Sequence, residues 1–112
     1  MGTYPTPVAP PPGHHLYNEF EVHCQLVTDV FRLEQLQETC RGAGLHVSGT
    51  KLTLARRIVG MDLTESYIAD RPSRAQLAYV AAAARRRHYV VSADVMRGKA
   101  RAMTWLSNHG DR

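Results

Sequence analysis

Residues 33–60 read LEQLQETCRGAGLHVSGTKLTLARRIVG, and this stretch decides the fold of the chain. Its first part predicts a short helix over 33–41, because apolar residues recur there at helical spacing. These residues are Leu33, Leu36 and Cys40. The run 42–44 (Gly-Ala-Gly) should end this helix, since glycine readily takes the left-handed conformation found after helix C-termini.

A second helix is predicted over about 50–60. The run 48–50 (Ser-Gly-Thr) supplies polar capping residues at its start, and Leu54 and Ile58 lie one turn apart along it. Between the two helices, residues 45–47 (Leu-His-Val) should fold back as a short apolar strap. The result is a hairpin of about thirty residues, which is too small to be stable alone and therefore needs flanking helices.

Helices are predicted on both sides of the hairpin. One covers about 18–30, and two more cover 73–87 and 92–108, joined by a link at 88–91. Their expected N-caps are Asn18, Ser73 and Ser92. The apolar side of the last helix should consist of Val95, Met96, Ala102, Met103, Trp105 and Leu106. The chain is therefore predicted to be all-α, with four or five helices.

The composition divides the chain into three parts. Residues 1–13 hold all but one of the six prolines and should form a disordered, Pro-rich arm. Residues 14–62 comprise the N-terminal helix and the hairpin, with the hairpin core at 31–61. Residues 73–108 form a C-terminal basic helix pair that should pack with the hairpin.

Charge is distributed unevenly between the two halves. Residues 1–70 carry five Lys and Arg against eight Asp and Glu, a net charge of −3. Residues 71–112 carry nine Lys and Arg against two Asp, a net charge of +7. A basic half on a small protein attracts polyanions such as nucleic acids, although a basic surface can equally be solvated.

The run from 36 to 58 resembles the SAP motif, a helix–turn–helix hairpin found in DNA-binding proteins. Its core, G-L-x-V-S-G-T-K, is present without a gap at 44–51, and the resemblance covers residues 31–61. One departure is Arg32, which stands where the motif often has a Ser or Thr that caps the first helix. The start of that helix is therefore expected either to be displaced along the chain or to be fused with the upstream helix near 28–29.

The SAP resemblance implies binding of double-stranded DNA, often with a preference for A·T-rich sequence, by the second helix and the loop before it. The residues agree with this implication, because backbone N–H groups at a helix N-terminus attract phosphate and Gly49 allows close backbone approach. Candidate nucleic-acid-binding residues here are Ser48, Gly49, Thr50, Lys51, Arg56 and Arg57. The alternative is that the hairpin contacts protein.

The C-terminal part, 73–108, is similar to a small helical repeat appended to some topoisomerases and helicases, but it lacks the proline that links the helices of that repeat. Arg85, Arg86 and Arg87 cannot all point one way on a helix, so at least one should face solvent or phosphate. They form either a phosphate-binding cluster or a solvated helix end that suits the helix dipole. Trp105 is expected to anchor the core rather than to stack on bases.

Catalytic, metal and cofactor sites are not expected. No nucleophile lies beside a base in the sequence, no carboxylates pair in a recognisable frame, and no phosphate-cradling P-loop is present. Cys24 and Cys40 belong to no CxxC pair and should be reduced thiols of an intracellular protein. The histidines His14, His15 and His23 fit no zinc pattern with Cys24 and are expected at the surface.

The sequence therefore predicts a non-catalytic nucleic-acid-binding protein that takes duplex DNA through the SAP-like loop and adds phosphate contacts from the basic helix pair. The alternative is a protein- or RNA-contacting subunit of a larger nucleic-acid complex. The expected partners are double-stranded DNA, structured RNA or a protein complex, with no small-molecule substrate. No membrane partner is expected, because the longest apolar stretch, 78–84, is far too short to span a bilayer.

Overall fold

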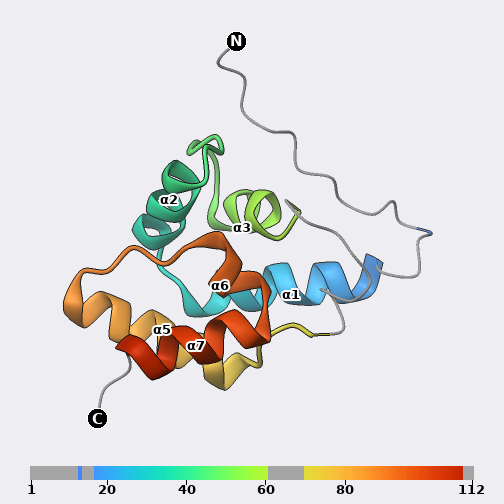
Figure 1. Cartoon of the computed structure of the whole chain (residues 1–112). Coiled ribbons are helices and arrows are strands. Elements are labelled where there is room, and N and C mark those ends of the chain that lie inside the picture. Colours follow the sequence, from blue (N-terminus) through green and yellow to red (C-terminus); the bar gives the residue numbers. More distant parts are fainter. Residues whose placement is uncertain (1–12, 14–16, 61–69, 110–112) are drawn as a thin grey trace.

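Helices make up most of the part of the chain that the computed structural model describes, which is residue 13 and residues 17–60 and 70–109. In chain order they are α1 (Tyr17–Val30), α2 (Leu33–Gly42), α3 (Lys51–Val59), α5 (Arg74–Arg87), α6 (Ala93–Arg97) and α7 (Lys99–His109) (Figure 1). No strand occurs within these described ranges, so the predicted all-α class is confirmed. The predicted arm at 1–13 lies, except for Gly13, outside the described residues.

Two expectations for the first two helices are corrected. One concerns the start of α1, and the other concerns its fusion with α2. Asn18 lies inside α1, because the helix already begins at Tyr17. Fusion of α1 with α2 does not occur, since Arg32 adopts an extended conformation between them. The backbone N–H of Arg32 donates to Oε1 of Gln35 at 3.0 Å, which is the half of a capping box that the third helical residue supplies. The other half, a Ser or Thr oxygen that accepts from the first turn of α2, is missing.

The end of α2 follows the prediction. Gly44 has a φ of +73°, in the left-handed region that a glycine adopts without strain. The N–H of Leu45 then donates to the carbonyl oxygen of Cys40 at 2.8 Å, and the N–H of Gly44 donates to that of Arg41 at 3.3 Å. This pair of bonds is the Schellman ending of a helix. It turns the buried Leu45 back onto the core as the first residue of the predicted strap.

The C-terminal part begins as predicted and then departs from the prediction. Ser73 caps α5, its hydroxyl oxygen accepting from the N–H of Gln76 at 3.2 Å. The single last helix expected over 92–108 is wrong, because Gly98 is extended and divides it into α6 and α7. The N–H of Lys99 donates to the carbonyl oxygen of Asp70 at 2.8 Å, which ties the start of α7 to the residues before α5. On α7, Met103 is 53% exposed and is not part of the apolar side.

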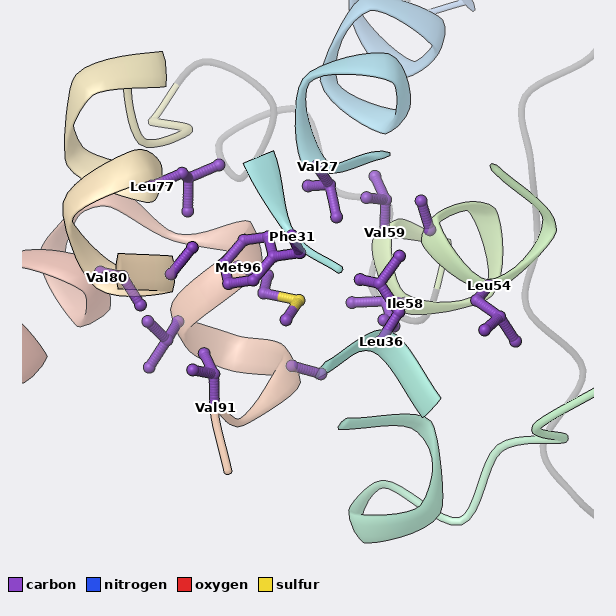
Figure 2. Close-up of a cluster of buried hydrophobic side chains, with 14 of the residues drawn as sticks. Val27, Phe31, Leu36, Leu54, Ile58, Val59, Leu77, Val80, Val91 and Met96 are labelled. Atoms are coloured by element: carbon purple, nitrogen blue, oxygen red, sulfur yellow. The ribbon is translucent and has the colours of Figure 1, made fainter. Parts of the chain in front are cut away.

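One hydrophobic core joins the hairpin to its flanking helices. Figure 2 shows side chains from α1, α2, α3, α5 and α6 meeting at its centre; those labelled are Val27, Phe31, Leu36, Leu54, Ile58, Val59, Leu77, Val80, Val91 and Met96. Each such aliphatic or aromatic side chain contributes roughly 1.5–3 kcal/mol on burial. The hairpin alone would leave the side chains that pack against α1, α5 and α6 exposed to water, so burial by the flanking helices stabilises it.

Two further buried residues, Trp105 and His23, test expectations about which side chains lie inside the protein. Trp105 is only 8% exposed and meets Tyr89 edge-on, with ring centroids 6.2 Å apart, so its predicted role as a core anchor is confirmed. His23 was expected at the surface, and that prediction is wrong. Its ring is fully buried, and Nε2 lies 2.8 Å from the carbonyl oxygen of Met96 on α6. Burial lowers the pKa of His23 to about 4, because desolvation penalises the charged ring.

None of the described helices is both long enough and apolar enough to cross a lipid bilayer.

Candidate nucleic-acid interface

The loop between the two hairpin helices presents Ser48, Gly49 and Thr50 to solvent. The hydroxyl oxygen of Thr50 accepts a hydrogen bond from the N–H of Thr53 at 3.2 Å, which makes Thr50 the N-cap of α3. The next two N–H groups of the helix, at Lys51 and Leu52, have no intrahelical acceptor, as at every helix start. The exposed loop therefore leads directly into a set of backbone donors.

Gly49 is required by the shape of this loop. Its φ of +121° lies in a backbone region that residues other than glycine rarely adopt. A Cβ at this position would also approach Cγ2 of Thr53 to 3.0 Å. The absence of a side chain thus serves the fold of the loop as well as any close approach of a ligand.

Arg57, one of the predicted binding residues, binds within its own chain. Its Nη1 donates to the carbonyl oxygen of His46 at 3.0 Å and also to that of Ser48. The half-buried guanidinium therefore binds the loop of its own chain and occupies two carbonyl oxygens that would otherwise repel an anion. Arg57 positions the loop rather than reaching away from it.

Arg56 is also engaged within the molecule. Its Nη2 lies 2.7 Å from Oε2 of Glu21 on α1, and the arginine side chain is 48% exposed. An ion pair this exposed contributes at most about 1 kcal/mol, so a phosphate can replace the carboxylate at little cost. Lys51, by contrast, forms no ion pair or side-chain hydrogen bond with any described residue.

The three consecutive arginines at the end of α5 differ in exposure. Arg85 is half-buried, and its Nη1 donates to Oε1 of Gln35 in the first turn of α2 at 3.1 Å. Arg86 and Arg87 are exposed. The loop follows the other end of α2, so the predicted site residues form two groups, one near each end of this helix.

Several other basic side chains bind within the molecule. Arg71 donates to the carbonyl oxygen of Glu19, Arg74 pairs with Asp29 and Arg97 pairs with Asp94. The pair of Arg74 with Asp29 therefore compensates one positive charge of 71–112 with a carboxylate from α1. Within the described ranges, the cationic side chains that have no ion pair or side-chain hydrogen bond are Arg32, Arg41, Lys51, Lys99 and Arg101.

Two residues of this region were missed from the sequence. Arg41 is exposed in the last turn of α2, just before the loop, and its place at a helix end next to a G-A-G turn was the available signal. His46 was missed as well. Its Nδ1 lies 2.7 Å from Oγ of Ser48 and accepts from the Ser48 N–H at 3.4 Å. His46 precedes Ser48 by two residues, and this short spacing was the signal available in the sequence. An imidazole thus holds the Ser48 hydroxyl in place.

Comparison of the chain with family models, curated proteins and solved structures found no match. A function is therefore inferred from the residues and their geometry. At 46–51 the first N–H groups of α3 lie next to the side chain of Lys51, and such a combination of donors and positive charge suits an anionic group.

Proposed function

We propose that the chain binds nucleic acid, and duplex DNA in the first place, through residues 46–51. The observation that carries the proposal is the contact of Arg57 with the carbonyl oxygens of His46 and Ser48. A loop whose carbonyl oxygens are held by a cation offers an approaching anion N–H donors instead of lone pairs.

Each residue of the loop then has a stated role. The N–H groups of Lys51 and Leu52 donate to one phosphate, and the ammonium of Lys51, which forms no ion pair with a described residue, lies beside it. Thr50 holds the first turn of α3 through its bond from the Thr53 N–H. Arg56 exchanges its exposed pairing with Glu21 for a neighbouring phosphate. Such contacts fix the position of a duplex more than they read its sequence.

A second contact involves Arg86 and Arg87, which are exposed at the opposite end of α2 from the loop. Because the two groups lie near opposite ends of α2, they contact different phosphates of one duplex. Arg85 contributes indirectly, because its guanidinium is bonded to Gln35.

The test is a salt titration of binding, followed by the anisotropy of short labelled duplexes. If about 3–5 phosphates are neutralised, the logarithm of the association constant should fall with the logarithm of salt concentration with a slope of roughly −3 to −4.5. An A·T-rich duplex, a G·C-rich duplex and an RNA duplex of equal length are compared. Tighter binding to RNA would favour an RNA-contacting subunit, whereas binding that ignores salt, or no binding at low salt, would contradict the proposal.

A further inference from the structure

The imidazole of His46 leads to an inference about how binding by the loop is regulated. His46 is exposed in the segment that joins α2 to α3 at an edge of the molecule (Figure 1). Its Nδ1 lies 2.7 Å from Oγ of Ser48 and 3.4 Å from the backbone nitrogen of the same residue. A side chain that can change its charge is therefore bonded to the loop for which nucleic-acid binding is proposed.

Side chains bind both backbone groups of Ser48. Its carbonyl oxygen accepts from the guanidinium of Arg57, and its N–H donates to Nδ1 of His46. An arginine side chain stays protonated in proteins, so the bond to the carbonyl oxygen does not depend on pH. A histidine, by contrast, commonly changes its charge between about pH 5 and 8. The bond to the N–H of Ser48 is therefore the one that a change of pH can break.

The two contacts of Nδ1 indicate the form of the ring that the loop holds. A ring nitrogen accepts from a backbone N–H only through its lone pair, so the neutral ring carries its proton on Nε2. The hydroxyl of Ser48 donates to the same lone pair. A second proton on Nδ1 turns this nitrogen into a donor. The hydroxyl of Ser48 then rotates and accepts, whereas the backbone N–H loses its acceptor.

The elements beside the loop carry further charges. Arg41 lies in the last turn of α2, and Lys51 and Arg57 belong to α3. On α1, which packs against α3, Glu21 is paired with Arg56. A proton on His46 therefore adds a positive charge to a loop that cations of α2 and α3 already flank, and the attraction of the loop for an anion increases.

We propose that His46 makes nucleic-acid binding by the loop depend on pH, with the protonated ring as the binding form. This inference rests on the proposed function of residues 46–51. The neutral ring holds the N–H of Ser48, whereas the charged ring releases that N–H to a phosphate oxygen and adds its charge beside it. His46 is thus a positioning residue that acts through Ser48.

The first experiment follows the free, full-length chain by nitrogen-15 spectroscopy from pH 8 to pH 5.5. The amide signal of Ser48 should move together with the ring signals of His46, in the direction of a weaker hydrogen bond. His46→Asn should abolish this movement, because a carboxamide oxygen accepts from the N–H of Ser48 in place of Nδ1 and does not titrate. A Ser48 signal that does not follow the ring of His46 would overturn the proposal.

The second experiment measures binding of a short labelled duplex at the same two pH values. Affinity should be about fivefold higher at pH 5.5, as expected for one exposed charge contact, and the slope against salt should be steeper by about one unit. His46→Asn should bind like the unmodified chain at pH 8 and should lose the increase at pH 5.5. Because both proteins contain His23, any loss of stability through that residue at low pH affects them equally.

His88→Asn is the matched control. His88 is also exposed, and its φ of +57° lies in a region that asparagine readily adopts. This variant should keep the full increase in affinity at pH 5.5. An increase that persists in His46→Asn, or that disappears in His88→Asn, would assign the response to another group and overturn the proposal.

The outcomes also separate this inference from the proposed function. Duplex binding of equal strength at both pH values would overturn the regulation by His46 and leave the proposed function in place. Absence of binding at both pH values and at low salt would contradict the proposed function, and the regulation with it.

Discussion

Arg57 donates from its guanidinium to the carbonyl oxygen of His46, eleven residues earlier in the chain, at a distance of 3.0 Å. The sequence predicts Arg57 as a nucleic-acid-binding residue, and in the structure its guanidinium also holds the loop that begins at His46. This contact separates two effects that a mutation can have on binding. A residue that touches phosphate changes the salt dependence of binding, and a residue that positions the loop changes affinity alone.

The first prediction uses this separation. Arg57→Gln should weaken duplex binding about tenfold, because it removes hydrogen bonds from a charged donor, each contributing about 1.5–3 kcal/mol to the loop. The slope of binding against salt should remain nearly unchanged. Lys51→Gln should instead make that slope shallower by about one unit. Anisotropy titrations at several salt concentrations measure both quantities.

Lys99→Gln is the control for the lysine variant, since Lys99 is exposed at the start of α7 and carries the same charge. It should leave the slope as in the unmodified chain. An Arg57→Gln slope that falls as much as the Lys51→Gln slope would mean that Arg57 touches phosphate after all.

The second prediction concerns Gly49. Gly49→Ala should destabilise the fold by about 1–2 kcal/mol, because the φ of +121° strains any side chain and the new Cβ would press on Thr53. Gly42→Ala is the matched control, since a Cβ there meets no atom within 4 Å inside a helix. It should be neutral or stabilising by up to about 1 kcal/mol. Equal melting temperatures for the two variants would show that the loop relaxes without cost.

The third prediction concerns the arginines at the end of α5. Replacing both Arg86 and Arg87 with Gln should lower duplex affinity and make the salt slope shallower by about one unit for each phosphate contact that is lost. Arg85→Gln should lower stability by about 1 kcal/mol, since it breaks the bond to Gln35. A double variant that binds like the unmodified chain would remove the second contact from the account.

The fourth prediction follows from the buried His23. Its pKa is lowered from 6.5 to about 4 in the folded chain, so the unfolded chain binds a proton more readily below pH 6.5. The contribution of His23 is therefore fully present above pH 6.5 and is lost as the pH falls toward 4. The loss amounts to roughly 3 kcal/mol. Urea unfolding at pH 7 and at pH 4.5 should reveal it.

His23→Met removes this titration and should flatten the pH dependence between 6.5 and 4.5, at the cost of leaving the carbonyl oxygen of Met96 without its partner. If the variant loses stability over this range as steeply as the unmodified chain, the acid sensitivity comes from other groups.

Most of the helices could be predicted because their signals are local. The apolar spacing of Leu36 and Cys40 predicted α2, and Gly44 predicted its end. The polar residues before α3 and α5 predicted where those helices begin, and Thr50 and Ser73 are their N-caps. The division of the last helix at Gly98 was missed, since one glycine in a helical pattern is usually tolerated. Here the bond from Lys99 to Asp70, a contact across 29 residues, favours the break.

The conformation of the loop at 46–51 could be predicted from the sequence, but the partners of the arginines near it could not. Local pattern located the loop, because the helix cap and Gly49 are both encoded there. The partners of Arg56 and Arg85 could not be foreseen, because Glu21 and Gln35 lie 35 and 50 residues away and meet them only through packing. His23 was misplaced for the same reason, since its acceptor on Met96 is 73 residues away. Charge counted along the sequence therefore overstates the charge that is available to a ligand.

The most direct test of nucleic-acid binding through the loop is a nitrogen-15 titration of the full chain with a short duplex at low salt. The amide signals of Gly49, Lys51 and Leu52 should move first and furthest, and the signal of Val22, exposed on α1, should stay in place. Added salt should reverse the shifts. Shifts that gather elsewhere on the molecule, or no shifts at low salt, would contradict the account.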